Sequence, residues 1–355
     1  MKKFFIAAVC LLLAVMTLAG CTPASSIIKE TTAPETGIFA KPGENFLNEP
    51  KDYVIKSENY AFYVGEYMYF FITTLSSFSK DDLEVFGYKE GVSLKEQKVK
   101  GHDVTWFEFI DAITVEKLQK ILVACEYAYK EKTSYITDAK AYIELVKRNI
   151  KEASDNDPDG YVKELYGGAV SYQSYLNACQ MEYIYELYYR GIYADNMEII
   201  SDSELKEYAK DPENKDTTPV RKVVYFTAES RGKAQDFIDE LGNEVTEKAI
   251  FELADVHDLT AVNDTLTKDS DIAAEMIEWC FSSEREVGEG SVIRVEKEDL
   301  YEYWVVYYFG EGEETYLFRA RVELAGKLTD TQVESAVESY KSFTVDKKML
   351  DGINI

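Results

Sequence analysis

Apolar residues recur with a helical period through most of the first two-thirds of the chain. Leu118, Ile121, Leu122 and Cys125, for example, occupy positions i, i+3, i+4 and i+7 of one stripe. The pattern predicts long helices over 64–78, 106–132, 137–153 and 171–196, a short helix from 157, and another over 201–210. Residues 80–103 are polar and contain glycine, which predicts a loop or hairpin. This part of the chain is therefore expected to be helical.

The pattern changes after residue 216, where strand-like and helix-like runs alternate. Val220 and the run 223–226 predict a strand, and Ala234, Phe237 and Leu241 then follow a helical spacing. Beyond them, helices are predicted over 247–256, 272–281 and 329–343, a polar loop up to 269, and strands over 291–296, 301–309 and 316–324. A compact mixed unit of roughly ninety residues, which is domain-sized, is therefore expected within a helical chain.

Residues 1–20 have the pattern of a secretory signal. Lys2 and Lys3 precede an apolar stretch that is too short for a comfortable membrane span. The Leu-Ala-Gly sequence directly before Cys21 resembles the lipobox of bacterial lipoproteins, in which the cysteine is diacylated and becomes the new N-terminus. An ordinary signal peptide or an uncleaved anchor is the alternative. We expect lipidation at Cys21, an extracytoplasmic location at the cell membrane, and a flexible linker over 21–50, which is small, polar and proline-rich.

Composition narrows the class of partner. The formal net charge of −26 disfavours nucleic acid or anionic lipid as a ligand, since both would be repelled. With 46% apolar residues the chain has ample material for a core, and its length favours two domains. We therefore expect an acidic protein of two domains that binds no nucleic acid.

The residues that usually carry catalysis or bind metals are scarce. Beyond the signal and Cys21, three widely spaced cysteines remain, and Cys125 and Cys179 lie in apolar helical stripes typical of buried thiols. There are two histidines, no zinc-ligand spacing, and no motif for a nucleophilic serine, a phosphate loop or a dinucleotide. We expect no cofactor and no metal.

The segment 155–166 imitates a calcium-binding loop. Asp155, Asp157, Asp159 and Gly160 match its first, third, fifth and sixth positions, but Tyr166 stands where the bidentate glutamate belongs. The alternative is a helix start, with Asp157 as N-cap and a proline at the first helical position. The missing bidentate ligand favours the helix start.

A cluster of tyrosines in the longest predicted helix is a candidate for peptide binding. It consists of Tyr183, Tyr185, Tyr188, Tyr189 and Tyr193. Because these five cannot share one helical face, we expect some of them to be exposed or to face a second partner. Core packing explains most of them. The functional interpretation is an aromatic surface for unfolded or extended peptide, since amphipathic rings are effective contact residues.

Two parts of the chain resemble known families. The strand VRKVVYF, the helix AQDFIDEL and the later stretch AAEMIEWCFSSEREVGEGSVIRVE resemble a parvulin-type prolyl isomerase domain, with Glu275, Phe281, Gly288 and Glu289 where that family keeps glutamate, phenylalanine and Gly-Glu. The helices upstream, with YVKELYGGAVSYQSYL and SDSELKEYA, look like the chaperone domain of the SurA and PrsA group. The resemblance covers most of residues 51–345, and a lipidated N-terminus fits the PrsA-like members.

Departures from the parvulin pattern fall on its pocket. Lys222 stands where the family carries one histidine and Trp304 where it carries another, and the family's glycine-rich loop is absent. Prolyl isomerisation needs no nucleophile, only a pocket that twists the imide and lowers a barrier of about 18–20 kcal/mol. The polar floor of that pocket is missing, so we expect an inactive, degenerate isomerase domain. Phe281 is kept as a candidate for peptide binding.

Taken with the resemblance, the sequence predicts an α+β fold. A mostly helical chaperone domain like those of SurA and trigger factor is built from 51–215 and completed by 311–355, and a parvulin-like α/β domain is inserted at 216–310. The expected function is that of a membrane-anchored foldase-like lipoprotein that binds unfolded or extended secreted polypeptides. An active isomerase with an altered pocket is the first alternative. A solute-binding lipoprotein ranks last, because that class begins with repeated strand–helix units.

Overall fold

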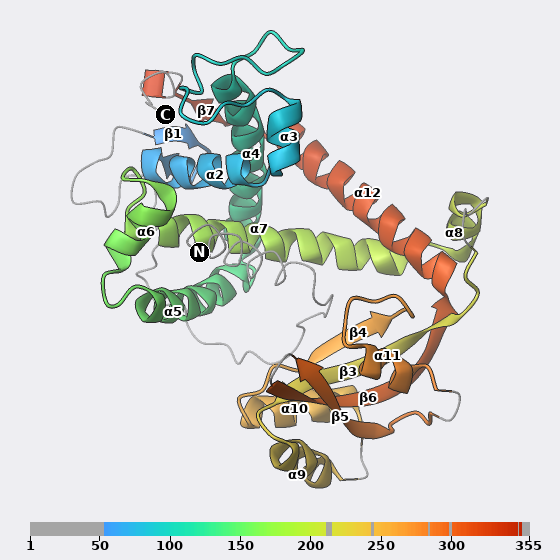
Figure 1. The fold of residues 1–355 in the computed structure, drawn as a ribbon. Helices are drawn as coiled ribbons and strands as arrows, with labels where there is room; N and C mark the ends of the chain where they lie inside the picture. Colours follow the sequence, from blue (N-terminus) through green and yellow to red (C-terminus); the bar gives the residue numbers. More distant parts are fainter. Residues whose placement is uncertain are drawn as a thin grey trace. The chain divides into compact units, whose positions relative to one another are not determined.

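The computed structural model of the protein describes residues 53–210, 215–242, 245–282, 285–297, 300–346 and 348–349. The described chain separates into two compact units (Figure 1). We call residues 53–192 and 329–349 the helical unit, and residues 193–328 the sheet unit. The fold class is α+β. Within the described ranges, no helix is both long and apolar enough to cross a membrane.

The helical unit consists of helices around one small sheet. Its helices are α2 (Val64–Ser76), α3 (Lys80–Val85), α4 (Trp106–Glu131), α5 (Tyr135–Ala153), α6 (Pro158–Tyr166), most of α7 (Tyr172–Ile199) and the end of α12 (Thr315–Ser339). The sheet has the order β2-β1-β7, formed by β2 (Ala61–Tyr63), β1 (Tyr53–Lys56) and β7 (Thr344–Val345), and it is antiparallel. The C-terminal strand β7 therefore pairs with the first described strand.

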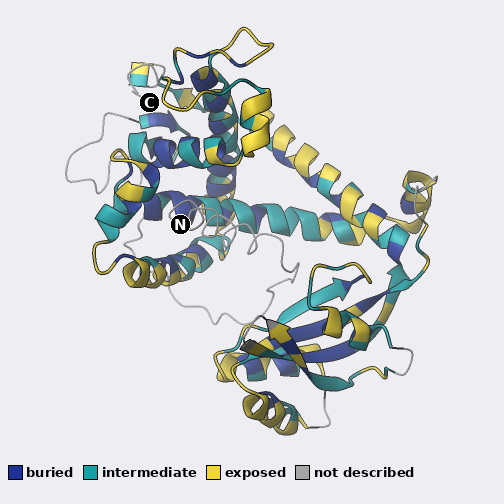
Figure 2. Cartoon of the chain, viewed as in Figure 1, coloured by how far each residue is buried: buried dark blue, intermediate teal, exposed yellow. Residues whose placement is uncertain are grey.

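Aromatic side chains fill the core of the helical unit, and buried residues concentrate on α2 and α4 (Figure 2). Phe71 on α2 contacts Phe107 on α4 with ring centroids 5.5 Å apart, and Tyr69 contacts Tyr166 and Tyr175 at 5.0 and 5.5 Å. Rings in these tilted and edge-on geometries attract each other beyond the area that they bury. The tyrosine and phenylalanine content of the sequence thus holds the helices together.

Capping residues set where several helices begin. Asp157 accepts a hydrogen bond from the backbone N–H of Gly160 at 3.0 Å and precedes Pro158, the first residue of α6. The helix-start interpretation of the segment 155–166 is confirmed. Ser201 and Glu204 form a capping box at the start of α8 (Asp202–Tyr208), within the helix predicted over 201–210.

The sheet unit carries a four-stranded antiparallel sheet of order β4-β3-β6-β5. Its elements are β3 (Pro219–Ala228), α9 (Arg231–Leu241), α10 (Glu247–Val256), β4 (Val262–Leu266), α11 (Ala274–Cys280), β5 (Gly290–Lys297) and β6 (Leu300–Glu314). One face, with Val224, Phe226 and Tyr307, packs against α9 and α10. The other, with Val223 and Val306, packs against α11. Alternation along the strands thus supplies both faces with apolar residues.

The chain enters and leaves this sheet at adjacent points. The backbone N–H and the hydroxyl of Thr315 both donate to the carbonyl of Thr218, at 2.9 and 2.7 Å. The N–H of Tyr316 donates to the carbonyl of Asp216 at 3.0 Å. Residues 217–315 therefore form an insertion whose ends meet.

Helices α8 and α12 and the end of α7 form a second, small core in the sheet unit, built around Ile200, Leu205, Ala320 and Ala325. Arg321 closes it: its guanidinium donates to the carbonyl of Ile200 at 2.7 Å and pairs with Glu313 at 2.8 Å. A cation is favourable at the C-terminal end of a helix, where carbonyls lack partners. The sheet unit therefore includes α8 and the adjoining ends of α7 and α12.

The predicted strand at 316–324 is wrong, because α12 runs without interruption from Thr315 to Ser339. Tyr-Leu-Phe-Arg-Ala-Arg-Val-Glu-Leu alternates apolar and polar residues over a short stretch, which imitates a strand. Leu317, Ala320, Leu324 and Ala325 nevertheless keep a helical spacing, and all four belong to the small core. Burial of that stripe decides the structure.

Candidate functional site

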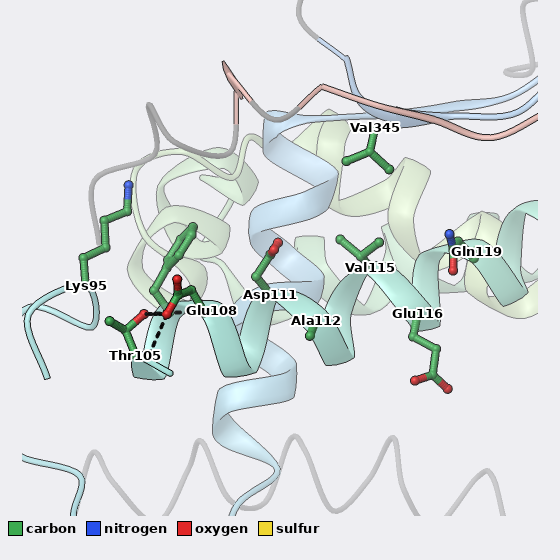
Figure 3. Close-up of a pocket in the computed structure, with 10 residues that line it drawn as sticks. Lys95, Thr105, Glu108, Asp111, Ala112, Val115, Glu116, Gln119 and Val345 are labelled. Atoms are coloured by element: carbon green, nitrogen blue, oxygen red, sulfur yellow. Dashed lines mark hydrogen bonds between the residues drawn. The ribbon is translucent and has the colours of Figure 1, made fainter. Parts of the chain in front are cut away.

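A groove of about 900 Å³ runs along the N-terminal half of α4 (Figure 3). Its lining residues are Lys95, Thr105, Phe107, Glu108, Asp111, Ala112, Val115, Glu116, Gln119 and Val345. Most of these follow one stripe of α4, where residues three and four apart share a face. Val345 on β7 points toward Val115 in Figure 3, so the sheet contributes to the lining as well.

The start of α4 is fixed by a reciprocal capping box. The N–H of Thr105 donates to the Glu108 carboxylate at 2.7 Å, and the N–H of Glu108 donates to the Thr105 hydroxyl at 3.2 Å. The hydroxyl of the buried Tyr67 on α2 donates to Asp111 Oδ1 at 2.7 Å. These bonds hold two carboxylates in place along the groove.

The lining of the groove combines apolar side chains with carboxylates. Ala112, Val115 and Val345 form the apolar part. The hydrogen bonds from the backbone and side chain of Thr105 hold the pKa of Glu108 below its usual value. Burial, and then the neighbouring Asp111 carboxylate, raise the pKa of the Tyr67 hydroxyl, so Tyr67 stays a neutral donor to Asp111.

The lining of the groove is suited to binding rather than to catalysis. Its described lining residues include no histidine or cysteine that could act as a general base or nucleophile. Residues 105 to 119 of α4 span about 21 Å at 1.5 Å per residue. An extended chain rises about 3.3 Å per residue, so the groove has the length of about six extended residues. The sequence pattern does not reveal this groove.

The five candidate tyrosines lie mostly in contact with other aromatic residues. Tyr188 is buried, the other four are half-buried, and none is fully exposed. Tyr183 stacks on Tyr142 with ring centroids 4.2 Å apart, and Tyr188 contacts the exposed Tyr127 at 5.0 Å. Tyr189 donates its hydroxyl hydrogen bond to Asp330 at 2.9 Å.

Packing therefore accounts for this cluster. Tyr183, Tyr185, Tyr188 and Tyr189 belong to the core of the helical unit, and Tyr193 belongs to the small core of the sheet unit. None of the five lines the groove along α4.

The two positions that depart from the parvulin pattern lie on different faces of the larger sheet. Trp304 is half-buried on the face covered by α11, where its ring lies 5.5 Å from that of Tyr225. Lys222 is exposed, and alternation along β3 places its side chain on the opposite face, with that of Val224. The structure does not bring these two side chains together.

Four other side chains, those of Tyr225, Asp264, Arg221 and Phe281, do gather on the face covered by α11. The Tyr225 hydroxyl donates to Asp264 at 3.3 Å, and burial raises the pKa of that aspartate despite its hydrogen bonds. Arg221 is buried, pairs with Glu311 at 2.7 Å and lies 5.1 Å from the ring of Phe281, which is half-buried. The parvulin resemblance places Lys222, and none of these residues except Phe281, at a pocket position. The sequence pattern does not reveal which face of the strand each side chain occupies.

The remaining candidate residues are cysteines. Cys21 lies outside the described residues. Cys125, Cys179 and Cys280 are buried free thiols, as predicted for the first two, and burial raises the pKa of Cys179 and of Cys280 to about 12. Among the described residues, no group of three or more histidine, cysteine or acidic side chains could hold a metal ion.

No protein-family model and no curated protein matches the chain. Among solved structures, the chain is similar to foldase protein PrsA from Lactococcus lactis, at 13% identity over 84% of this chain and 96% of that chain, with a TM-score of 0.27. It is similar to foldase protein PrsA from Streptococcus pneumoniae at 13% identity over 71% of this chain and 91% of that chain, with a TM-score of 0.25. The chain is also similar to peptidylprolyl isomerase PrsA from Bacillus anthracis, at 11% identity over 64% of this chain and 95% of that chain, with a TM-score of 0.21. TM-scores this low do not establish a common fold, so these likenesses lend no support of their own to a function.

Proposed function

We propose that this chain is a foldase-like lipoprotein that holds unfolded or extended polypeptide in the groove along α4. One observation carries the proposal: an open groove that is partly apolar and has a length suited to an extended segment lies beside a short sheet. Main-chain hydrogen bonds and small apolar contacts can hold peptides of many sequences. Binding is expected to be weak, because order must be imposed on the client.

The lipobox at Cys21 and the polar linker over 21–50 support a location outside the cytoplasm, attached to the membrane by lipid. The linker would allow the helical unit to reach polypeptides near the membrane surface. The net charge of −26 keeps the protein soluble and repels other copies.

Replacing Ala112 by tryptophan tests the groove directly. Ala112 is exposed on α4 and lines the groove, so a large ring there fills space without displacing the core. We expect the Ala112→Trp variant to lose most of its ability to suppress aggregation of a denatured test protein diluted into buffer. Light scattering with stoichiometric excess of the chain measures this.

Lys130→Trp is the matched control, since Lys130 is an exposed residue of the same helix outside the groove lining. This variant adds the same apolar ring and should suppress scattering as the unsubstituted chain does. Equal suppression by both variants would show that the groove does not hold the client. If no form of the chain reduced the scattering, the chain would have no chaperone activity and the proposed function would be wrong.

Prolyl isomerisation is the second candidate function, favoured by the half-buried Phe281 beside Arg221 and by the Tyr225–Asp264 pair. We nevertheless expect no useful catalysis, because the tyrosine hydroxyl is engaged with Asp264 and Trp304 covers the neighbouring surface. A protease-coupled assay on an Xaa-Pro peptide should show exchange at the uncatalysed rate, over about tens to hundreds of seconds. Marked acceleration that is lost in the Asp264→Ala variant would establish the isomerase instead.

A further inference from the structure

We propose that the groove along α4 selects cationic extended segments, and that such a segment adds as a further strand beside β7. This inference rests on the proposed function and names its class of ligand. It is carried by two observations on the described residues: the sign of the charges around the groove, and the direction of the backbone at Val345.

The charges around the groove are mostly negative. Glu108, Asp111 and Glu116 line it, and Lys95 is the one basic lining residue. Lys95 also lies over the ring of Phe107, with its Nζ 4.6 Å from the ring centroid. The ammonium group is thus held at one end of the groove by the buried aromatic ring, while the carboxylates extend along α4 (Figure 3).

A groove lined by both carboxylates and apolar side chains discriminates between clients. A segment with lysine or arginine gains attraction to these carboxylates, of which Glu116 is also paired with Lys120 at 2.8 Å, whereas an acidic segment is repelled by them and by the net charge of the whole chain. Small apolar side chains on the other face of the segment would meet Ala112, Val115 and Val345. The segment that fits has a basic face and an apolar face, a pattern that an extended strand presents with a period of two.

The pairing of β7 with β1 fixes where a further strand can bond. Asp346 donates its N–H to the carbonyl of Val54 at 2.8 Å, and Val345 lies opposite Ile55 in the antiparallel register. Hydrogen-bonded and non-hydrogen-bonded pairs alternate in such a ladder, so Val345 is in a non-hydrogen-bonded pair. Its N–H and C=O therefore point away from β1, toward the edge of the sheet.

The position of β7 suits strand addition. It is the outer strand in the order β2-β1-β7 of the described sheet, and the side chain of its Val345 lines the groove. An added strand at this edge would lie along the groove and could bond the backbone of Val345 in both directions. The same residue would then contribute backbone bonds and an apolar contact.

The test uses the soluble chain from residue 22, which lacks the lipidation site Cys21, with three fluorescently labelled short peptides in which valine alternates with lysine, glutamine or glutamate. Fluorescence anisotropy should give the tightest binding for the lysine peptide, weaker binding for glutamine and the weakest for glutamate. The advantage of lysine should shrink at high salt, because exposed charges are screened. Equal affinity for the three peptides would overturn the selection by charge while leaving the proposed function standing.

The triple variant Glu108→Gln, Asp111→Asn, Glu116→Gln keeps the hydrogen-bond acceptors of the capping box and of Tyr67. It should weaken binding of the lysine peptide by about tenfold, since three charge interactions with the peptide are lost. The control Glu90→Gln, Glu131→Gln, Glu152→Gln changes three exposed carboxylates outside the groove and should bind as the unsubstituted chain does. An equal loss in both variants would assign the preference to net charge alone and overturn the inference.

Val345→Pro tests the strand. Proline removes the N–H that points away from β1 and leaves the β1–β7 ladder intact, as proline does on edge strands. Val345→Ala keeps the N–H and shortens the side chain. We expect the proline variant to bind all three peptides more weakly than the alanine variant, at equal Tm.

Two outcomes overturn strand addition: equal binding by Val345→Pro and Val345→Ala, or a second copy of the chain in the groove. The second would appear as a dimer in sedimentation that the Ala112→Trp variant abolishes. The scattering measurement on a denatured client decides the proposed function separately, whatever these peptides do.

Discussion

Replacing Trp106 by alanine is expected to lower the free energy of unfolding of the helical unit by about 3–5 kcal/mol. Trp106 is fully buried, and its ring lies 5.4 Å from Tyr88, 5.9 Å from Phe109 and 6.2 Å from Phe78. Its backbone N–H also donates to the carbonyl of Gln97 at 2.9 Å. Removing the indole leaves a cavity at the point where the segment before α4 is attached to the helix.

The chain offers its own internal reference for this measurement. It has three tryptophans, and the other two, Trp279 and Trp304, belong to the sheet unit. Far-UV circular dichroism should show the transition of the helical unit at a lower Tm, by about 2–4 °C per kcal/mol for a domain of this size. The tryptophan fluorescence of the Trp106→Ala variant reports the sheet unit alone, and its transition should stay in place.

Trp106→Phe should cost much less than Trp106→Ala. The indole Nε1 is buried, and no described residue accepts a hydrogen bond from it. Phenylalanine removes this unsatisfied donor, whose burial costs about 1–3 kcal/mol, and keeps part of the ring. If Trp106→Phe and Trp106→Ala were equally destabilising, ring packing would not be the main contribution of this residue.

Local signals in the sequence predicted most of the helices. The apolar stripe predicted a helix over 106–132, within a residue of the bounds of α4 at Trp106 and Glu131, and the helix predicted over 201–210 contains α8. These elements are determined by hydrogen bonds and packing between residues close in the sequence, which a pattern reveals.

The strand β4 escaped prediction because its sequence is polar. Val-Asn-Asp-Thr-Leu gives little strand signal, and the segment was expected to be a loop. It forms an edge strand by pairing with β3, which lies elsewhere in the chain. Long-range pairing of this kind leaves no local pattern to read.

The groove could not be predicted from the sequence for the same reason. Val345 and Val115 come from distant parts of the chain and meet because β7 pairs with β1, at the other end of the described residues. The five tyrosines of α7 were predicted to bind peptide because they lie close together in the sequence. They are buried or half-buried because they pack on partners from other helices, such as Tyr142 on α5, which the sequence pattern does not identify.

Removing the insertion is expected to leave the chaperone activity intact. Asp216 and Tyr316 are joined by a hydrogen bond of 3.0 Å, so residues 217–315 can be replaced by a short Gly-Ser linker without stretching the chain. The excised variant loses the larger sheet with α9, α10 and α11, including Phe281 and Trp304. It retains the whole groove along α4.

Light scattering of a denatured client with this excised chain tests most directly whether polypeptide is held by the helical unit. Circular dichroism first establishes that the helical unit of the excised chain melts as in the full chain. The excised chain should then suppress scattering as well as the full chain, and adding Ala112→Trp to it should abolish the suppression. An excised chain that keeps the melting transition of the helical unit but no longer suppresses scattering would contradict this account and place client binding in the removed sheet.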